Sequence, residues 1–130
     1  MRPLTLLLLS VTAGTTAADL PTRRGTIRVE ANGFEAREAD IAKVCLSAVG
    51  ELQKFCPELP TEDVVIVRGT KGPITLFRRN DRGEVVVKLD TGKTYWSQYA
   101  YQVAHEFGHV HCGFRPGPQH NQWFEESVCE

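Results

Sequence analysis

Hydrophobic and polar residues alternate with two different periods along this 130-residue chain, and each period predicts a type of secondary structure. Residues 25–31 place Ile27 and Val29 between polar neighbours, which is the pattern of a half-buried strand. Residues 35–55 instead repeat apolar side chains at helical spacing, before two prolines end the segment. The apolar stripe of this predicted core-facing helix consists of Ile41, Cys45, Ala48, Val49, Leu52 and Phe55.

Three more strands are predicted after this helix. Residues 64–67 are short and β-branched and lie between Asp63 and Gly69, which predicts a strand buried on both faces. Residues 74–78 and 84–89 flank an Asn-Asp-Arg-Gly turn and are expected to form a hairpin.

A second amphipathic helix is predicted over residues 95–111, and residues 122–130 carry a third helical pattern. Gly113 and a Pro-Gly-Pro sequence end the second helix. Its apolar stripe consists of Ala100, Val103, Ala104, Phe107 and Val110. We therefore predict one α+β domain in which a strand, a helix and three strands precede two helices.

The first 18 residues differ in composition from the rest. Arg2 precedes a leucine-rich run, and small residues ending at Ala18 come before Asp19. This order is typical of a secretory signal peptide, and the apolar run is shorter than the roughly 20 residues of a membrane span. We expect a secreted or periplasmic protein with cleavage after Ala18, a mature domain over residues 19–130 and no stable membrane span.

The charge balance and the cysteines narrow the function classes further. Lys and Arg total 15 against 16 Asp and Glu, which leaves no basic excess for binding nucleic acid. All four cysteines lie in the mature segment, where export permits disulfides. We favour a pairing of Cys112 with Cys129, whereas Cys45 is equally well explained as a free, buried thiol. Cys45 and Cys56 are not expected to pair, because a helix would separate them by about 16 Å.

The candidate chemistry lies in residues 105–109, His-Glu-Phe-Gly-His. His105 and His109 share one face of the predicted helix, so both imidazoles can bind a single ion. Glu106 lies about 100° around the helix from His105, where it can act as general base for a water molecule. The alternative interpretation is a surface helix with solvated histidines. We favour the metal site because the motif lies on an amphipathic helix of an exported chain and follows a predicted sheet.

A catalytic zinc needs three protein ligands and one open position, so a third ligand must come from elsewhere. His111 points to another part of the helix, and Arg115 stands six residues after His109, where one known extension of the motif has a third histidine. The remaining candidates are His120, Glu125, Glu126 and Glu130.

Residues 105–109 together with the stretch 123–130, Trp-Phe-Glu-Glu-Ser-Val-Cys-Glu, resemble the gluzincin metallopeptidases, which include thermolysin-like and aminopeptidase N-like enzymes. In that family a second helix supplies a glutamate ligand from a stretch similar to W-L-N-E-G-x-A-E. Matching the two stretches places the ligand at Glu126, with Glu125 at the Asn position and Ser127 at the Gly position. Glu130 then matches an acidic residue that hydrogen-bonds the first histidine, as ligating histidines commonly require.

The resemblance implies a zincin-like N-terminal subdomain that holds one zinc ion on His105, His109 and Glu126. Glu106 would take a proton from an activated water and pass it to the leaving amine, so a peptide or protein substrate would be hydrolysed. By the same resemblance, residues 84–89 are expected to be the sheet edge that pairs with the substrate.

Family members usually carry further substrate-binding residues after the second helix, so we expect a domain truncated at its C-terminus. Two alternatives remain from the sequence. One is a non-catalytic zinc-binding or interaction domain on a zincin scaffold, and the other is a helix without a metal.

Overall fold

The structure is a computed structural model that describes residues 25–56, 62–112 and 122–130, with side chains from residue 125 onward in the last segment. Its elements confirm the predicted α+β class and the predicted order of strands and helices. In chain order they are β1 (Ile27–Val29), α1 (Glu38–Phe55), β2 (Val64–Arg68), β3 (Ile74–Thr75), β4 (Val85–Leu89), α2 (Trp96–His111) and α3 (Gln122–Cys129).

The four strands form one sheet in the order β1-β2-β4-β3. β1, β2 and β4 are parallel, and β3 pairs antiparallel with β4, which confirms the predicted hairpin, although β3 ends at Thr75 and not at the predicted Arg78. The expectation that residues 84–89 form the sheet edge was wrong, because β4 pairs with β2 on one side and with β3 on the other. β3 is therefore the edge strand at this end of the sheet.

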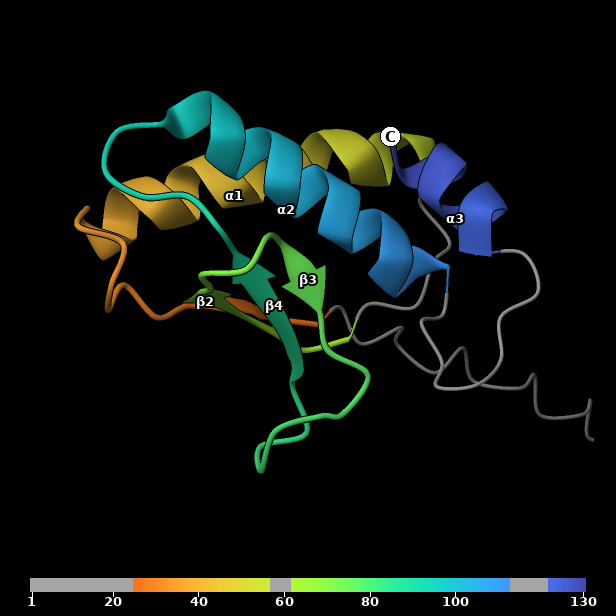
Figure 1. Cartoon of the computed structure of the whole chain (residues 1–130), viewed down its shortest axis with the longest axis horizontal. Coiled ribbons are helices and arrows are strands. Elements are labelled where there is room, and N and C mark those ends of the chain that lie inside the picture. The colour runs from red at the N-terminus through yellow and green to blue at the C-terminus, as the bar shows by residue number, and fades with distance from the viewer. Residues whose placement is uncertain (1–24, 57–61, 113–121) are drawn as a thin grey trace, which may run out of the picture.

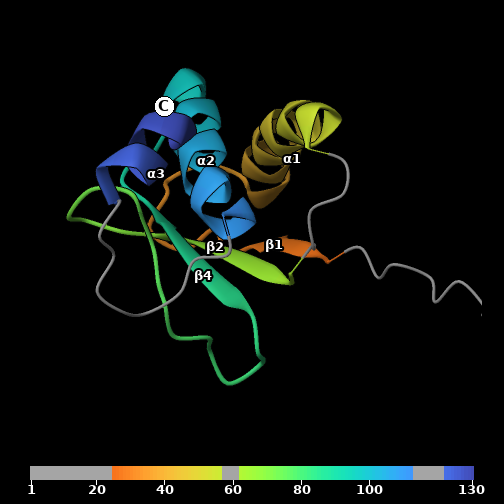
Figure 2. The same cartoon turned by 90° about the vertical axis from the view of Figure 1, so that its right-hand side faces the viewer.

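Both long helices lie on one face of the sheet (Figures 1 and 2). The hydrophobic core fills the space between them and the strands, and the alternation along β4 buries Val85, Val87 and Leu89. Fully buried side chains from the helices are Ile41, Cys45, Val49, Tyr99 and Val103. Within the described residues, every helix is too short or too polar to cross a bilayer.

Three details of the predicted helices differ from the structure. Phe55 is 84% exposed, because it occupies the last position of α1, where the helix has passed the core. α1 begins at Glu38, and Glu35 before it has a positive φ of 55°, which a helix does not allow. Tyr99, which was not assigned to the apolar stripe of α2, is completely buried and packs on Phe34 at 5.6 Å between ring centroids.

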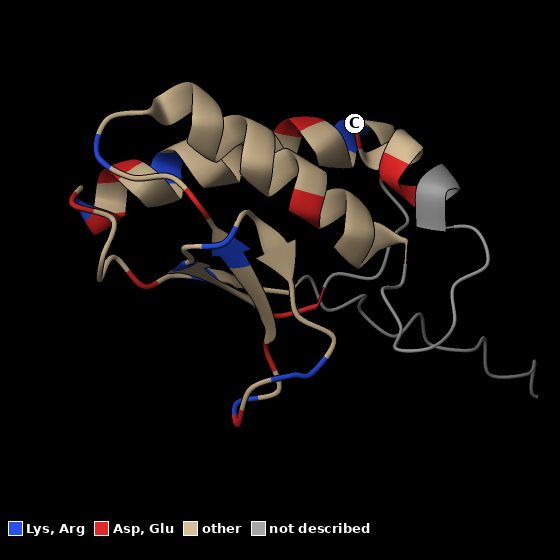
Figure 3. Cartoon of the chain, in the orientation of Figure 1, with Lys and Arg blue, Asp and Glu red and all other residues tan. Residues whose placement is uncertain are grey.

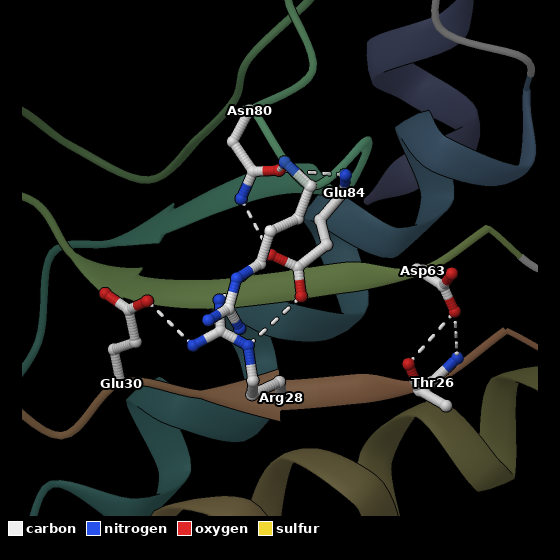
Figure 4. Close-up of polar contacts among 7 residues, drawn as sticks. Thr26, Arg28, Glu30, Asp63, Asn80 and Glu84 are labelled. Carbon is white, nitrogen blue, oxygen red and sulfur yellow. Dashed lines mark hydrogen bonds and ion pairs between the residues drawn. The ribbon is translucent and has the colours of Figure 1, made fainter.

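An ion pair fastens β1 to the beginning of β4 across the intervening strand (Figure 4). Glu84 accepts hydrogen bonds from Arg28 Nε at 3.1 Å and Nη2 at 2.9 Å, and from Asn80 Nδ2 at 2.7 Å. These bonds hold the pKa of Glu84 at about 2, well below its ordinary value. Val65 of β2 pairs in register with Arg28, and only 2% of Val65 is exposed. The prediction that this strand is buried on both faces is therefore confirmed at Val65.

Candidate metal centre

The two histidines of the motif lie next to each other on α2, facing α3. Their ring centroids are 5.0 Å apart with an edge-on arrangement of the rings. Their side chains are 13% exposed for His105 and 8% exposed for His109. The two imidazoles are therefore held in a nearly closed site between two helices rather than on an open helix surface, which contradicts the solvated alternative.

Glu126 of α3 completes a triangle of donor atoms with these histidines. Its Oε2 atom is 3.4 Å from His105 Nε2 and 3.5 Å from His109 Nε2. Tetrahedral zinc with bonds of about 2.0–2.1 Å separates neighbouring ligand atoms by about 3.3 Å, so both distances fit one ion. All three donor atoms lie within 4.8 Å of one another, and these residues could hold a metal ion.

Glu125 lies behind the second histidine. Its Oε1 atom is 2.8 Å from His109 Nδ1, and 19% of its side chain is exposed. An ionised carboxylate only accepts hydrogen bonds, so this contact favours the tautomer with the proton on Nδ1, which leaves the lone pair of Nε2 free to bind a metal. This is the carboxylate partner that a ligating histidine usually has.

Glu130 lies near the first histidine but does not hydrogen-bond it. Glu130 Oε1 is 3.9 Å from His105 Nδ1, which is too long for a hydrogen bond. Its Oε2 atom accepts a bond from the Tyr101 hydroxyl at 2.6 Å, and this bond raises the pKa of Tyr101. His105 Nδ1 is buried without a hydrogen-bond partner among the described residues, and Glu130 is the nearby carboxylate that could accept a bond from it after a small movement.

Glu106 occupies a separate, buried position on the sheet side of α2. It is the only Asp, Glu, Lys or Arg residue in that helix (Figure 3), and 3% of it is exposed. Its Oε2 atom accepts a hydrogen bond from the Thr75 hydroxyl at 2.6 Å. A buried carboxylate is costly to maintain unless it is hydrogen-bonded, and the Thr75 hydroxyl supplies a bond here.

Gly108 allows α3 to approach α2 closely enough for these contacts. A Cβ atom at position 108 would lie 2.7 Å from Cys129 Sγ and 3.3 Å from Cys129 Cα. A side chain there would push against the backbone of α3, so the placement of Glu126 depends on this glycine.

The remaining predicted residues have other positions. His111 Nδ1 lies 2.6 Å from the Phe107 carbonyl, so His111 does not join the donor triangle, as the sequence indicated. His120 lies outside the described residues. All four cysteines are free in this structure, so the predicted Cys112–Cys129 disulfide is not formed in it.

The sequence did not reveal the contacts of three residues, Glu125, Thr75 and Gly108. The contact of Glu125 could have been inferred, because each of two predicted histidine ligands usually has a hydrogen-bond partner and only Glu130 had been predicted as one. A glycine inside a helical pattern is a recognised sign of close packing, and this sign applies to Gly108. No sequence signal joins Thr75 to Glu106 across 31 residues.

Comparisons with known proteins identify no relative. No family model matches the chain, and no curated protein and no solved structure is significantly similar to it.

Proposed function

We propose that this chain is an exported zinc-dependent peptidase of the gluzincin type, built on a zincin-like subdomain. The observation that carries the proposal is the triangle of His105, His109 and Glu126, in which Glu126 Oε2 lies 3.4 Å and 3.5 Å from the two Nε2 atoms, close to the spacing of neighbouring zinc ligands. Two histidines and one glutamate are a donor set of catalytic zinc sites, which keep one position open. The Glu126 side chain is 45% exposed, which favours access to that position.

Glu106 is the proposed general base. When bound, zinc acts as a Lewis acid on the attacking water and on the scissile carbonyl. The water's O–H bond would break, its proton would move to the Glu106 carboxylate, and its oxygen would bond to the carbonyl carbon as the C=O π pair moves onto the carbonyl oxygen. That pair would re-form the C=O bond as the C–N bond breaks, and Glu106 would pass the proton to the leaving nitrogen. Among the described residues, its carboxylate is buried and accepts a hydrogen bond from a neutral hydroxyl, that of Thr75.

The edge strand β3 is the proposed binding site for the substrate backbone. An extended peptide can add a strand to an exposed sheet edge, where main-chain hydrogen bonds align it. β3 uses one side to pair with β4, and Thr75 on this strand contacts Glu106. A peptide on the other side of β3 would therefore lie beside the general base.

Metal binding is the first test. Purified protein is expected to retain about one equivalent of zinc, measured by elemental analysis, and His109→Ala should lose it. Glu125→Ala should weaken zinc binding by about 10- to 100-fold, because it leaves the His109 ring without its carboxylate partner. His111→Ala is the matched control and should keep the metal. Equal zinc retention by all four proteins would reject the site.

Turnover is the second test. Glu106→Gln should retain zinc and lose hydrolysis of a fluorescence-quenched peptide mixture, because an amide cannot accept the water's proton. Zinc binding without any turnover that depends on Glu106 would instead favour the non-catalytic zinc-binding domain. Export is tested separately, since the mature protein should begin at Asp19 in N-terminal sequencing.

A further inference from the structure

Thr75 is the residue through which the sheet edge contacts the candidate general base. It lies on β3, directly beneath α2 (Figure 1), and 2% of it is exposed. Its Oγ1 atom is 2.6 Å from Glu106 Oε2 and 3.3 Å from the Glu106 carbonyl oxygen. One hydroxyl proton serves one strong bond, so the short contact to the carboxylate is the principal one.

This bond fixes an orientation that the helix alone leaves open. The terminal torsion of a glutamate is broad, and the carboxylate of an unsupported Glu106 would rotate. Thr75 is stiff at χ1 because it is β-branched, and its backbone is held in register with Val87 of β4. A rigid donor on the sheet therefore determines where the two carboxylate oxygens lie.

The donor is also of the right charge. A hydroxyl is a neutral donor, so Thr75 orients the carboxylate through a hydrogen bond rather than through an ion pair. With Oε2 bound to Thr75, Oε1 is the oxygen that takes the proton of the attacking water.

We propose that Thr75 is a positioning residue for Glu106 and that the edge strand thereby fixes the orientation of the general base's carboxylate. This inference rests on the proposed peptidase function. It adds a residue of the sheet to a site whose other members all lie on α2 and α3.

The test compares Thr75→Val, which keeps the side-chain shape without the hydroxyl, with Thr75→Ser, which keeps the hydroxyl. Thr91→Val is the matched control, because Thr91 is also buried and its hydroxyl bonds Gln98 Oε1 at 3.0 Å. Each full-length protein is loaded with zinc, and its zinc affinity, its kcat and KM on the peptide mixture and its affinity for acetohydroxamate are measured. Acetohydroxamate binds zinc and presents an acidic O–H group to a neighbouring base, so its affinity depends on the orientation of the Glu106 carboxylate and can be measured without turnover.

Thr75→Val is expected to lower kcat by at least about tenfold, which is the loss of one hydrogen bond to a charged group, with KM and zinc affinity within about threefold. Acetohydroxamate affinity should fall by a similar factor. Thr75→Ser should restore both values to within about threefold of the original protein, and Thr91→Val should change neither.

Three outcomes would overturn the inference. The first is that Thr75→Val leaves both kcat and acetohydroxamate affinity unchanged, although turnover by the original protein depends on Glu106. The second is a loss that Thr75→Ser does not restore, and the third is a parallel loss of zinc affinity, since both indicate a structural role. If the original protein shows no turnover that depends on Glu106, the proposed function fails, and acetohydroxamate binding alone then tests the Thr75 contact.

Discussion

Replacement of Gly108 by alanine should weaken metal binding although it adds only one methyl group. The new Cβ atom would lie 3.1 Å from Cys129 Cβ and 3.3 Å from Cys129 Cα. Carbon atoms in contact are usually about 3.5–4.0 Å apart, so α3 must shift by about 0.5 Å. Metal ligands keep their positions within about 0.2 Å, and Glu126 lies one helical turn before Cys129. The shift is therefore larger than the site tolerates.

The expected loss of stability follows from one favourable effect and two unfavourable ones. Alanine in a helix interior is about 1 kcal/mol more favourable than glycine, whereas overpacking costs about 1–3 kcal/mol. The free energy of unfolding of zinc-free Gly108→Ala should therefore fall by about 0–2 kcal/mol. Misplacing Glu126 should weaken zinc binding by about 10- to 100-fold, so the zinc-loaded variant should lose a further 1.4–2.7 kcal/mol, roughly.

The assay is a zinc titration in competition with a chromophoric chelator, together with urea unfolding with and without zinc. Gly50→Ala is the matched control, because Gly50 also lies inside a helix and a Cβ atom there would meet nothing within 4 Å. Gly50→Ala should stabilise the protein slightly and leave zinc affinity unchanged. A zinc affinity for Gly108→Ala within threefold of that of Gly50→Ala would refute the reasoning. Removing the Cys129 side chain in Gly108→Ala should restore part of the lost affinity.

Two further predictions concern charge and redox state. Because hydrogen bonds from Arg28 lower the pKa of Glu84 to about 2, the stability that Glu84 contributes should be present above about pH 4.5 and lost as the pH falls toward 2. In urea unfolding at several pH values, the free energy of unfolding that Glu84→Gln loses relative to the original protein should shrink as the pH falls from about 4.5 toward 2. Glu30→Gln, which removes an exposed partner of the same arginine, should change the free energy of unfolding little at every pH. Equal losses for the two variants would contradict this. Oxidised glutathione should join Cys112 to Cys129, stabilising the fold by about 3 kcal/mol, and the reaction should accelerate at alkaline pH because burial raises the pKa of Cys129 to about 12. Peptide mapping without reduction checks the link, and a bond from Cys112 to Cys56 instead would show that the pairing is wrong.

The sequence by itself determined the elements and the part of the site that is local. Helical spacing predicted α1 and α2, and the turn at residues 80–83 predicted the hairpin, because both patterns depend on neighbours a few residues apart. The adjacency of His105 and His109 follows from the helical repeat alone. The nearness of Glu126 to both histidines came from a family resemblance rather than from periodicity, and the donor distances agree with it.

Only the tertiary structure decided which strand lies at the edge and which residues support the site. Strand order is a property of the whole sheet, so no local pattern could place β4 inside it and β3 at its edge. Likewise, the contacts of Thr75 with Glu106 and of Glu125 with His109 join residues far apart in the chain. Such pairs form because core packing sets the helices against the sheet and against each other, and Gly108 allows the closest of these approaches.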